Sequence, residues 1–244
     1  MLTQGNTRLL VFIFCFAVFS TFGQDRGKPP VLTTNVWSEG SIMTKNGNEL
    51  IGLVRFQNVV DFEDHEKQLT LTAKDVVAFE FFDDQTQKQR LFYSFPYQDK
   101  DSVIRPQFFE SLIELESFAL LSKTDPVDIS RKLVRTDDYW NGSRISEGYS
   151  EILVTLTFSE TLYLRDSEGN IKPYLRIENK DIDGRVFDRK RTKSKVLDSD
   201  LLVNVLRKDV LEKLEKFASE NKLSFRDKDN LLEIFRFCKE NLER

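Results

Sequence analysis

Two glutamates provide the chain's simplest candidate chemistry. Glu80 and Glu110 both stand among aromatic residues, and two carboxyl groups about 5 to 10 Å apart across a cleft can serve as the acid and the base of a hydrolase. The sequence does not fix the distance between them. Carboxylates on the wet face or edge of a sheet are the commoner arrangement, so we assign no catalytic residue.

His65 is the single histidine and stands in the charged run DFEDHEK, residues 61–67. A nucleophilic triad needs histidine beside a nucleophile and an orienting acid. Calcium takes six or more oxygen ligands, from a loop with a glycine at a set position that this run lacks. We therefore expect an exposed histidine in a charged turn, formed with Asp61, Glu63, Asp64 and Glu66.

A second acidic motif begins like a calcium loop. The run Asp181-Ile182-Asp183-Gly184 is followed by Arg185, where a third oxygen ligand belongs, and no glutamate closes a twelve-residue loop. The sequence thus predicts no metal site, and it indicates no bound cofactor.

Aromatic residues in a polar segment form the strongest binding candidate. Tyr139 and Trp140 follow Asp137 and Asp138 in a segment, residues 136–150, that is typical of a long loop. Such aromatics can stack on a sugar or anchor a protein partner. They can equally fold back over a sheet edge. We take these four residues as the candidate binding site.

A basic stretch, Arg185 to Lys195, holds six positive charges. It could meet the phosphates of lipopolysaccharide or anionic headgroups, or it could be a solvated linker. Cys238 lies on an apolar helical stripe and is interpreted as a buried small hydrophobe.

Alternating residues and turn signals predict most of the strands that must position these groups. Asn46-Gly47 lies between alternating segments within Ser41 to Phe56 and predicts a hairpin turn. A second turn is predicted at Asp166 to Asn170. Residues 108–122 fit either one helix or two strands, because periodicity alone does not decide between them. Three more strands are expected, at Gln68 to Thr72, Val76 to Phe82 and Arg90 to Tyr97.

Near the C-terminus the apolar period changes to that of a helix. One helix is expected to begin near Asp198 or Ser199, and a second to begin around Ser224 to Asp227. The first would bury Leu202, Leu206, Val210, Leu214 and Phe217, and the second Leu231, Ile234 or Phe235, Cys238 and Leu242.

These patterns predict an α+β fold, in which an antiparallel β-rich sheet or roll is followed by a C-terminal helical hairpin. The β-rich domain is expected over 31–180, a charged connector over 181–199, and the two-helix segment over 200–244. The 21 phenylalanines are expected to form the bulky part of the core.

The first residues have the pattern of a secretory signal peptide. Arg8 precedes an apolar run, and the small-x-small sequence Thr21-Phe22-Gly23 predicts cleavage before Gln24. This gives a signal peptide over 1–23 and a polar leader over 24–30. We expect export to the periplasm or beyond, with no transmembrane span after signal removal.

Composition narrows the function classes. The formal net charge is -4, with 31% charged and 40% hydrophobic residues. This is an ordinary soluble composition rather than that of a disordered chain. Modest acidity and an exported address argue against nucleic acid as a partner.

Several motifs together resemble a family. They are G-S-I-x-x-K-N-G-x-E-L-x-G-L-V-R-F from Gly40 to Phe56, A-F-E-F-F-D from Ala78 to Asp83, R-L-F-Y-S from Arg90 to Ser94, F-F-E-S-L before a Leu-Leu pair, and L-S-F-R-D-K-D-N-L from Leu223 to Leu231. In this respect the chain is similar to uncharacterised exported proteins of the Gram-negative cell envelope. The resemblance favours two strands over residues 108–122 and implies no assigned activity.

Three functions follow from these observations. The leading hypothesis is a non-enzymatic binding module of the envelope, which meets another envelope protein or a glycan through a sheet edge or the Tyr139-Trp140 segment. The alternatives are a periplasmic hydrolase using Glu80, Glu110 or Asp137, and a structural or chaperone-like helper for other exported proteins.

Overall fold

A single large antiparallel sheet dominates the structure, a computed structural model that describes residues 36–84, 86–98, 102–125, 128–136, 139–140, 143–144, 149–183 and 189–241. In these ranges the sheet has twelve strands. Eleven follow the order β14-β13-β12-β8-β7-β6-β5-β1-β2-β3-β4, and the twelfth, β9, pairs with β12. The predicted signal peptide and leader lie outside the described residues. The strands are β1 Ser38–Thr44, β2 Glu49–Phe56, β3 Val60–Glu63, β4 Gln68–Leu71, β5 Val76–Asp83, β6 Lys88–Gln98, β7 Ile104–Glu114, β8 Phe118–Thr124, β9 Asp128–Thr136, β12 Tyr149–Asp166, β13 Ile171–Asp183 and β14 Arg189–Val196.

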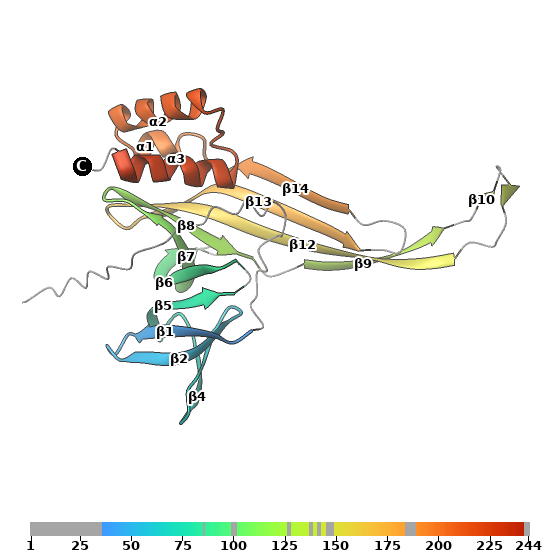
Figure 1. The fold of residues 1–244 in the computed structure, drawn as a ribbon, viewed down its shortest axis with the longest axis horizontal. Helices are drawn as coiled ribbons and strands as arrows, with labels where there is room; N and C mark the ends of the chain where they lie inside the picture. Colours follow the sequence, from blue (N-terminus) through green and yellow to red (C-terminus); the bar gives the residue numbers. More distant parts are fainter. Residues whose placement is uncertain are drawn as a thin grey trace, which may run out of the picture.

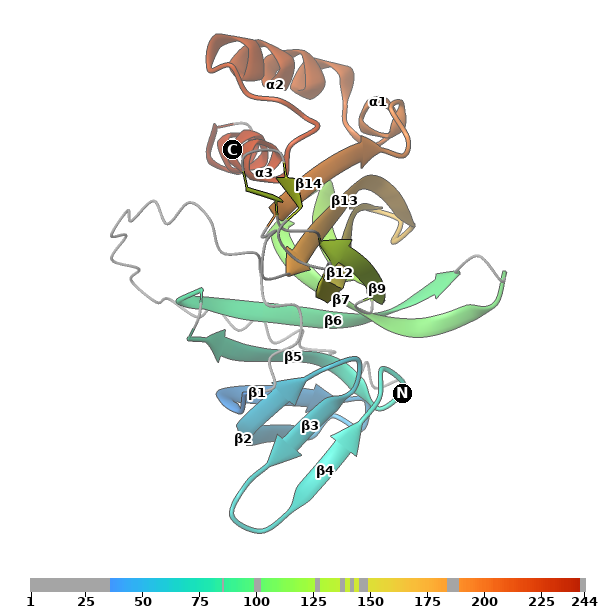
Figure 2. The same cartoon turned by 90° about the vertical axis from the view of Figure 1, so that its right-hand side faces the viewer.

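Helices follow the sheet, as the α+β expectation requires. They are α1 Leu201–Val205, α2 Lys208–Glu220 and α3 Lys228–Asn241. Figure 2 shows these helices at one end of the molecule and β1 to β4 at the opposite end. A large antiparallel sheet with helices at the C-terminal end therefore fits the predicted class.

Both predicted hairpin turns are confirmed. Gly47 has a φ of 82°, which costs glycine little, and its N–H donates to the Thr44 carbonyl at 3.0 Å. In the second turn Gly169 has a φ of 90°, and the Asp166 carboxylate accepts the Asn170 N–H at 2.8 Å. These turns join β1 to β2 and β12 to β13.

Residues 108–122 form two strands rather than one helix. They contribute to β7 and β8, which pair antiparallel around a tight turn where the Leu115 N–H donates to the Phe118 carbonyl at 2.9 Å. Phe108 and Phe109 are both buried although they point to opposite faces. Because the sheet is covered on both faces here, the apolar run is unbroken. This is why the sequence alone fits both one helix and two strands.

Phenylalanine rings fill the N-terminal core, as predicted. Phe79 lies parallel to Phe92 with ring centroids 4.7 Å apart, and Phe108 meets Phe79 edge-on at 5.1 Å. The rings join Ile42, Val54 and Phe62 in one buried cluster. A second core lies where β8, β12 and β13 meet the three helices.

The first predicted helix is two helices. The chain leaves α1 at Leu206, whose φ and ψ of -92° and 145° are extended, and α2 starts after Arg207. The break keeps Leu206 buried against the sheet. The apolar spacing continues across the break, so the sequence could not show it.

The last helix begins at Lys228, at the end of the expected range. Asp227 caps it by accepting the N–H at the third helical position, from Asn230 at 3.0 Å. Ser224 closes the preceding turn by accepting the Arg226 N–H at 3.2 Å. Leu231, Phe235 and Cys238 are buried as predicted, and Leu242 lies outside the described residues.

The segment expected as a charged connector carries sheet structure. β13 continues to Asp183, and β14 occupies residues 189–196, paired with β13 from Leu175↔Val196 to Ile182↔Arg189. Long charged side chains are stable on a strand whose faces are open to water, so a charged run does not exclude a strand.

Candidate functional site

A β-arm projects from the body of the protein (Figure 1). It consists of β9, the outer part of β12, and the part of β13 that pairs with β14. β14 itself runs from the arm to its base. β12 is 18 residues long; residues 160–166 pair with β8 in the body and residues 149–157 pair with β9 in the arm. The arm is therefore a direct extension of the central sheet.

The predicted aromatic pair lies at the far end of this arm (Figure 1). Tyr139 and Trp140 form the short strand β10, Tyr139–Trp140, which pairs with β11, Ser143–Arg144, as a separate ladder. The expected loop thus contains a small two-stranded element. Asp137 and Asp138, the two other candidate binding residues, lie outside the described residues.

Strand register places the basic residues of β14 on one face of the arm. Alternate strand residues share a face, so Arg189, Arg191, Lys193 and Lys195 all lie on the same side. Their partners on β13 are Ile182, Lys180, Glu178 and Arg176 in that order. The alternation of these four cations is already present in the sequence, but as a sign of a strand it is weaker than apolar alternation.

The proposed acid pair does not form. Glu80 pairs with Leu91, whereas Glu110 pairs with Phe92, the next residue of β6. Because neighbouring residues of a strand point to opposite faces, Glu80 and Glu110 lie on opposite sides of the sheet. Glu80 and Glu110 therefore cannot act together as the acid and base of a hydrolase. Asp137, the third candidate, lies outside the described residues.

Glu110 is instead bound to a half-buried arginine. Both of its carboxylate oxygens accept hydrogen bonds from Arg90 at 2.8 Å, and the Asp83 carboxylate lies 3.5 Å from the same guanidinium. Burial alone would lower the pKa of Arg90. The hydrogen bonds to Glu110 and the attraction of its charge together outweigh burial, so the net shift of the pKa is upward. The side chain remains a cation under all working conditions.

A second buried polar group joins the sheet to the helices. Glu160 is 5% exposed and accepts hydrogen bonds from Ser122 at 2.6 Å and from Lys228, at the start of α3, at 2.5 Å. Lys228 supplies the opposite charge that a buried carboxylate requires. The contact fixes the first turn of α3 against β12.

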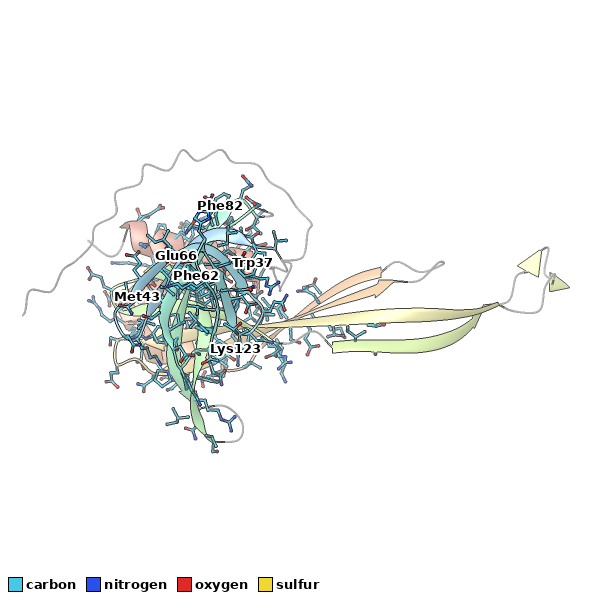
Figure 3. All side chains as sticks on the ribbon, turned by 90° about the horizontal axis from the view of Figure 1, so that it is seen from below. Trp37, Met43, Phe62, Glu66, Phe82 and Lys123 are labelled. Carbon is cyan, nitrogen blue, oxygen red and sulfur yellow. The ribbon has the colours of Figure 1, made fainter. Side chains whose placement is uncertain are left out.

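A hollow of about 480 Å³ opens beside the phenylalanine core. Phe56, Phe92 and Phe108 supply apolar lining, and Lys123, which lies at the base of the arm in Figure 3, also lines the hollow. Its size suits a small ligand. Several of its polar groups are already hydrogen-bonded within the protein: Arg90 donates to Glu110, and the Lys123 ammonium donates to the Gln107 amide. The hollow therefore does not define a ligand class.

The charged run around His65 forms a turn. Asp64 accepts the N–H groups of Glu66 and Lys67 at 2.8 and 2.9 Å, and these hydrogen bonds lower the pKa of Asp64. Asp61 binds Arg55 and Thr70, and His65 is exposed. Two of the four carboxylates are thus engaged in local structure, as a charged turn requires.

The second candidate for metal binding is extended. Asp181 and Asp183 belong to β13, where they pair with Leu156 and Val154, and Gly184 lies outside the described residues. A straight strand cannot wrap ligands around one ion as a loop does. Within the described ranges, no three His, Cys, Asp or Glu side chains gather closely enough to hold a metal.

No protein-family model, curated protein or solved structure matches the chain. In the part of the chain that the structure describes, no helix has the length and apolarity needed to cross a bilayer. The arm, with Tyr139 and Trp140 at its end and the basic strand β14 along its side, is the candidate functional site.

Proposed function

We propose that the protein is an exported, non-enzymatic binding module of a bacterial cell envelope, and that the arm contacts its partner, another envelope protein or a glycan. The observation that carries this proposal is the position of Tyr139 and Trp140. They form a strand at the end of an arm that extends away from the hydrophobic cores. Aromatic residues contribute much of the binding energy at such contacts.

The sequence supports the exported address in this proposal. Residues 1–23 have the charge, apolar run and cleavage pattern of a signal peptide. The resemblance of five motifs to exported envelope proteins agrees with that assignment. A partner in the envelope is then the class of molecule that the arm would meet.

The C-terminal helices have a supporting role in the proposal. We assign α2 and α3 as a helical hairpin that holds the base of the arm in place. Phe217 of α2 stacks on Phe237 of α3 with ring centroids 4.0 Å apart, and Phe235 meets Phe118 of β8 at 4.9 Å. The contact of α3 with β8, which pairs with β12, would fix the strand from which the arm extends.

Tryptophan fluorescence provides a direct test, because the chain has only two tryptophans. In a Trp37→Phe protein, Trp140 alone reports binding. We expect its emission to shift on titration with peptidoglycan fragments, lipopolysaccharide or detergent-extracted envelope proteins. The component that gives the shift should bind a Trp140→Ala protein about 30-fold more weakly, which is the effect of losing one hot-spot residue.

A matched control separates the arm from general hydrophobic contact. Phe82 is 38% exposed and lies on β5 in the body (Figure 3). Phe82→Ala should keep full affinity, and both alanine variants should keep the wild-type melting temperature. Full affinity of Trp140→Ala together with weakened binding by Phe82→Ala would refute the proposal. Turnover of a glycosidase or esterase substrate that needs Glu80 or Glu110 would favour the hydrolase instead.

A further inference from the structure

β14 ends the sheet and leaves one side of its backbone without a strand partner. In the described part of the chain it pairs only with β13. In an antiparallel strand, alternate residues direct their N–H and C=O groups away from the neighbouring strand. Over its eight residues β14 therefore offers a row of donors and acceptors along the outer side of the arm.

The residues along this row have a regular charge pattern. Five of the eight residues in RKRTKSKV are basic, and all four odd-numbered positions, Arg189, Arg191, Lys193 and Lys195, are cations on one face. Along a strand these positions repeat about every 6.6 to 6.8 Å. Residues 192–195 are exposed. A strand added here would place every second side chain beside one of the cations.

Charged edge strands also protect proteins from aggregation, so the pattern needs comparison with the other end of the sheet. β4, with the sequence QLTL, is that end and carries no charge. It is only four residues long, and a short edge offers little to an incoming strand. β14 is twice as long and carries a cation at every odd-numbered position, which is more than protection requires.

The charges also determine which strand can be added. A second copy of β14 would bring five cations beside five cations and offers no counter-charge in any register, which disfavours the pair. An apolar strand would leave the cationic row without counter-charges. A strand with acidic residues at alternate positions satisfies both the backbone groups and the cations.

We infer that the outer edge of β14 binds an extended, acidic segment of a partner protein by strand addition, with acidic side chains at alternate positions beside Arg189, Arg191, Lys193 and Lys195. This inference rests on the proposed function, since both make the arm the part that meets a partner. It adds the partner's chemistry and a second contact, separate from the ladder that carries Tyr139 and Trp140.

Fluorescence anisotropy with designed peptides tests the inference. The probe is a dye-labelled eight-residue peptide of alternating glutamate and threonine. A control peptide has the same composition with its glutamates grouped together. We expect the alternating peptide to bind at least about tenfold more tightly, because only it matches the spacing of the cations. Equal binding of the two peptides would show attraction of charge alone and would overturn strand addition.

Backbone methylation gives a second, independent measurement. Methyl groups on alternate amide nitrogens remove the donors on one side of the peptide strand. Of the two peptides methylated in opposite registers, one should lose binding and the other should keep it, because only one side faces β14. Equal effects of the two registers would contradict an added strand.

Charge reversal on the protein completes the design. Lys193→Glu with Lys195→Glu should weaken the alternating peptide about tenfold or more. Lys213→Glu with Lys216→Glu makes the same change in net charge on exposed positions of α2 and should leave affinity unchanged. Both proteins should keep the wild-type melting temperature. Equal weakening by the two pairs of substitutions would refute a site on β14.

The outcome can be separated from that of the proposed function. Trp140→Ala should bind the alternating peptide as tightly as wild type. If no designed peptide binds while Trp140 emission still responds to an envelope component, the edge inference fails and the proposed function stands. Peptide binding with an unresponsive Trp140 would support the edge and refute the role of the aromatic pair.

Discussion

Arg90 and Glu110 face each other from β6 and β7 and share two hydrogen bonds of 2.8 Å. The guanidinium also lies over the rings of Phe81 and Phe92, 5.7 and 5.1 Å from their centroids. Glu110, a candidate catalytic acid by its sequence, therefore balances the charge of Arg90 beside the aromatic core.

This pairing predicts an asymmetric response to substitution. Glu110→Gln leaves the half-buried Arg90 charge without its main partner, and we expect it to lower the free energy of unfolding by about 3 kcal/mol. The triple change Asp83→Asn, Arg90→Met and Glu110→Leu removes the cation together with both of its carboxylate partners and should cost clearly less. Urea unfolding of the wild-type protein and the two variants measures the difference. A triple variant less stable than Glu110→Gln would contradict this account.

Two tyrosines predict how stability falls at high pH. Burial, aided by the charges of Glu114 and Glu80, raises the pKa of Tyr93 to about 12, and burial raises the pKa of Tyr174 to about 12. An unfolded phenol ionises at its ordinary pKa of 10.0. The folded state thus holds protons that the unfolded state releases. The stabilisation is complete below pH 10 and is lost as pH rises from about 10 to about 12.

Tyr93→Phe and Tyr174→Phe should each make this loss of stability shallower. Denaturant unfolding at a series of pH values gives the slope, and the ultraviolet absorbance of the phenolate gives the titration itself. Ionisation of both phenols near pH 10 in the folded protein would show the prediction to be wrong.

Two glycines predict different costs for the same substitution. A Cβ atom on Gly40 would lie 2.2 Å from the Glu80 backbone oxygen, so Gly40→Ala must displace β5 and should cost about 3 kcal/mol or more. Gly47 has open space around it but a φ of 82°, so Gly47→Ala should cost about 1 kcal/mol. Thermal unfolding ranks the two. The reverse order would mean that β1 and β5 are not in the described register.

Cys238 predicts a chemical signal for opening of the helical layer. Its side chain is 2% exposed, and Phe235, on the same helix, is fully buried. We expect a thiol reagent to label the native protein slowly. Phe235→Ala should destabilise the fold by about 3 to 5 kcal/mol and accelerate labelling strongly. Phe82→Ala, on the exposed face of β5, serves as the control and should label at the wild-type rate.

The signal peptide prediction has a simple readout. Expression of the full chain in a Gram-negative host should yield a periplasmic or secreted protein whose first residue is Gln24, within a few positions. Intact-mass measurement identifies that end. Recovery of the unprocessed chain from the cytosol would remove the exported address from the proposed function.

The hairpins and the phenylalanine strands could be predicted because their signals are local. Gly47 and Gly169 stand at turn positions that favour glycine, and Val76 to Phe82 alternates along a single strand. The broken first helix could not be predicted, since Leu202, Leu206 and Val210 keep a helical spacing although the chain is extended at Leu206. Tertiary burial, rather than local preference, decides the backbone there.

The arm shows a different limit of sequence reasoning. β14 lacks the apolar alternation that identifies most strands. Its sequence offers only alternating cations, and its pairing with β13 shows that it is a strand. The separation of Glu80 from Glu110 likewise depends on which residues of β5, β6 and β7 pair, and one step of register reverses it. The aromatic pair could be selected by residue type, but its place at the end of an arm could not.

The unbroken course of β12 has a mechanical consequence. A partner pulling on the end of the arm applies tension along one continuous backbone, residues 149–166, into the centre of the sheet. The hydrogen bonds of an antiparallel ladder run perpendicular to the strands, so this tension loads the β12 ladders with β8 and β13 in shear, with many bonds sharing the force at once. The fold is thus suited to transmit traction between a tethered partner and its own body without unravelling from the tip.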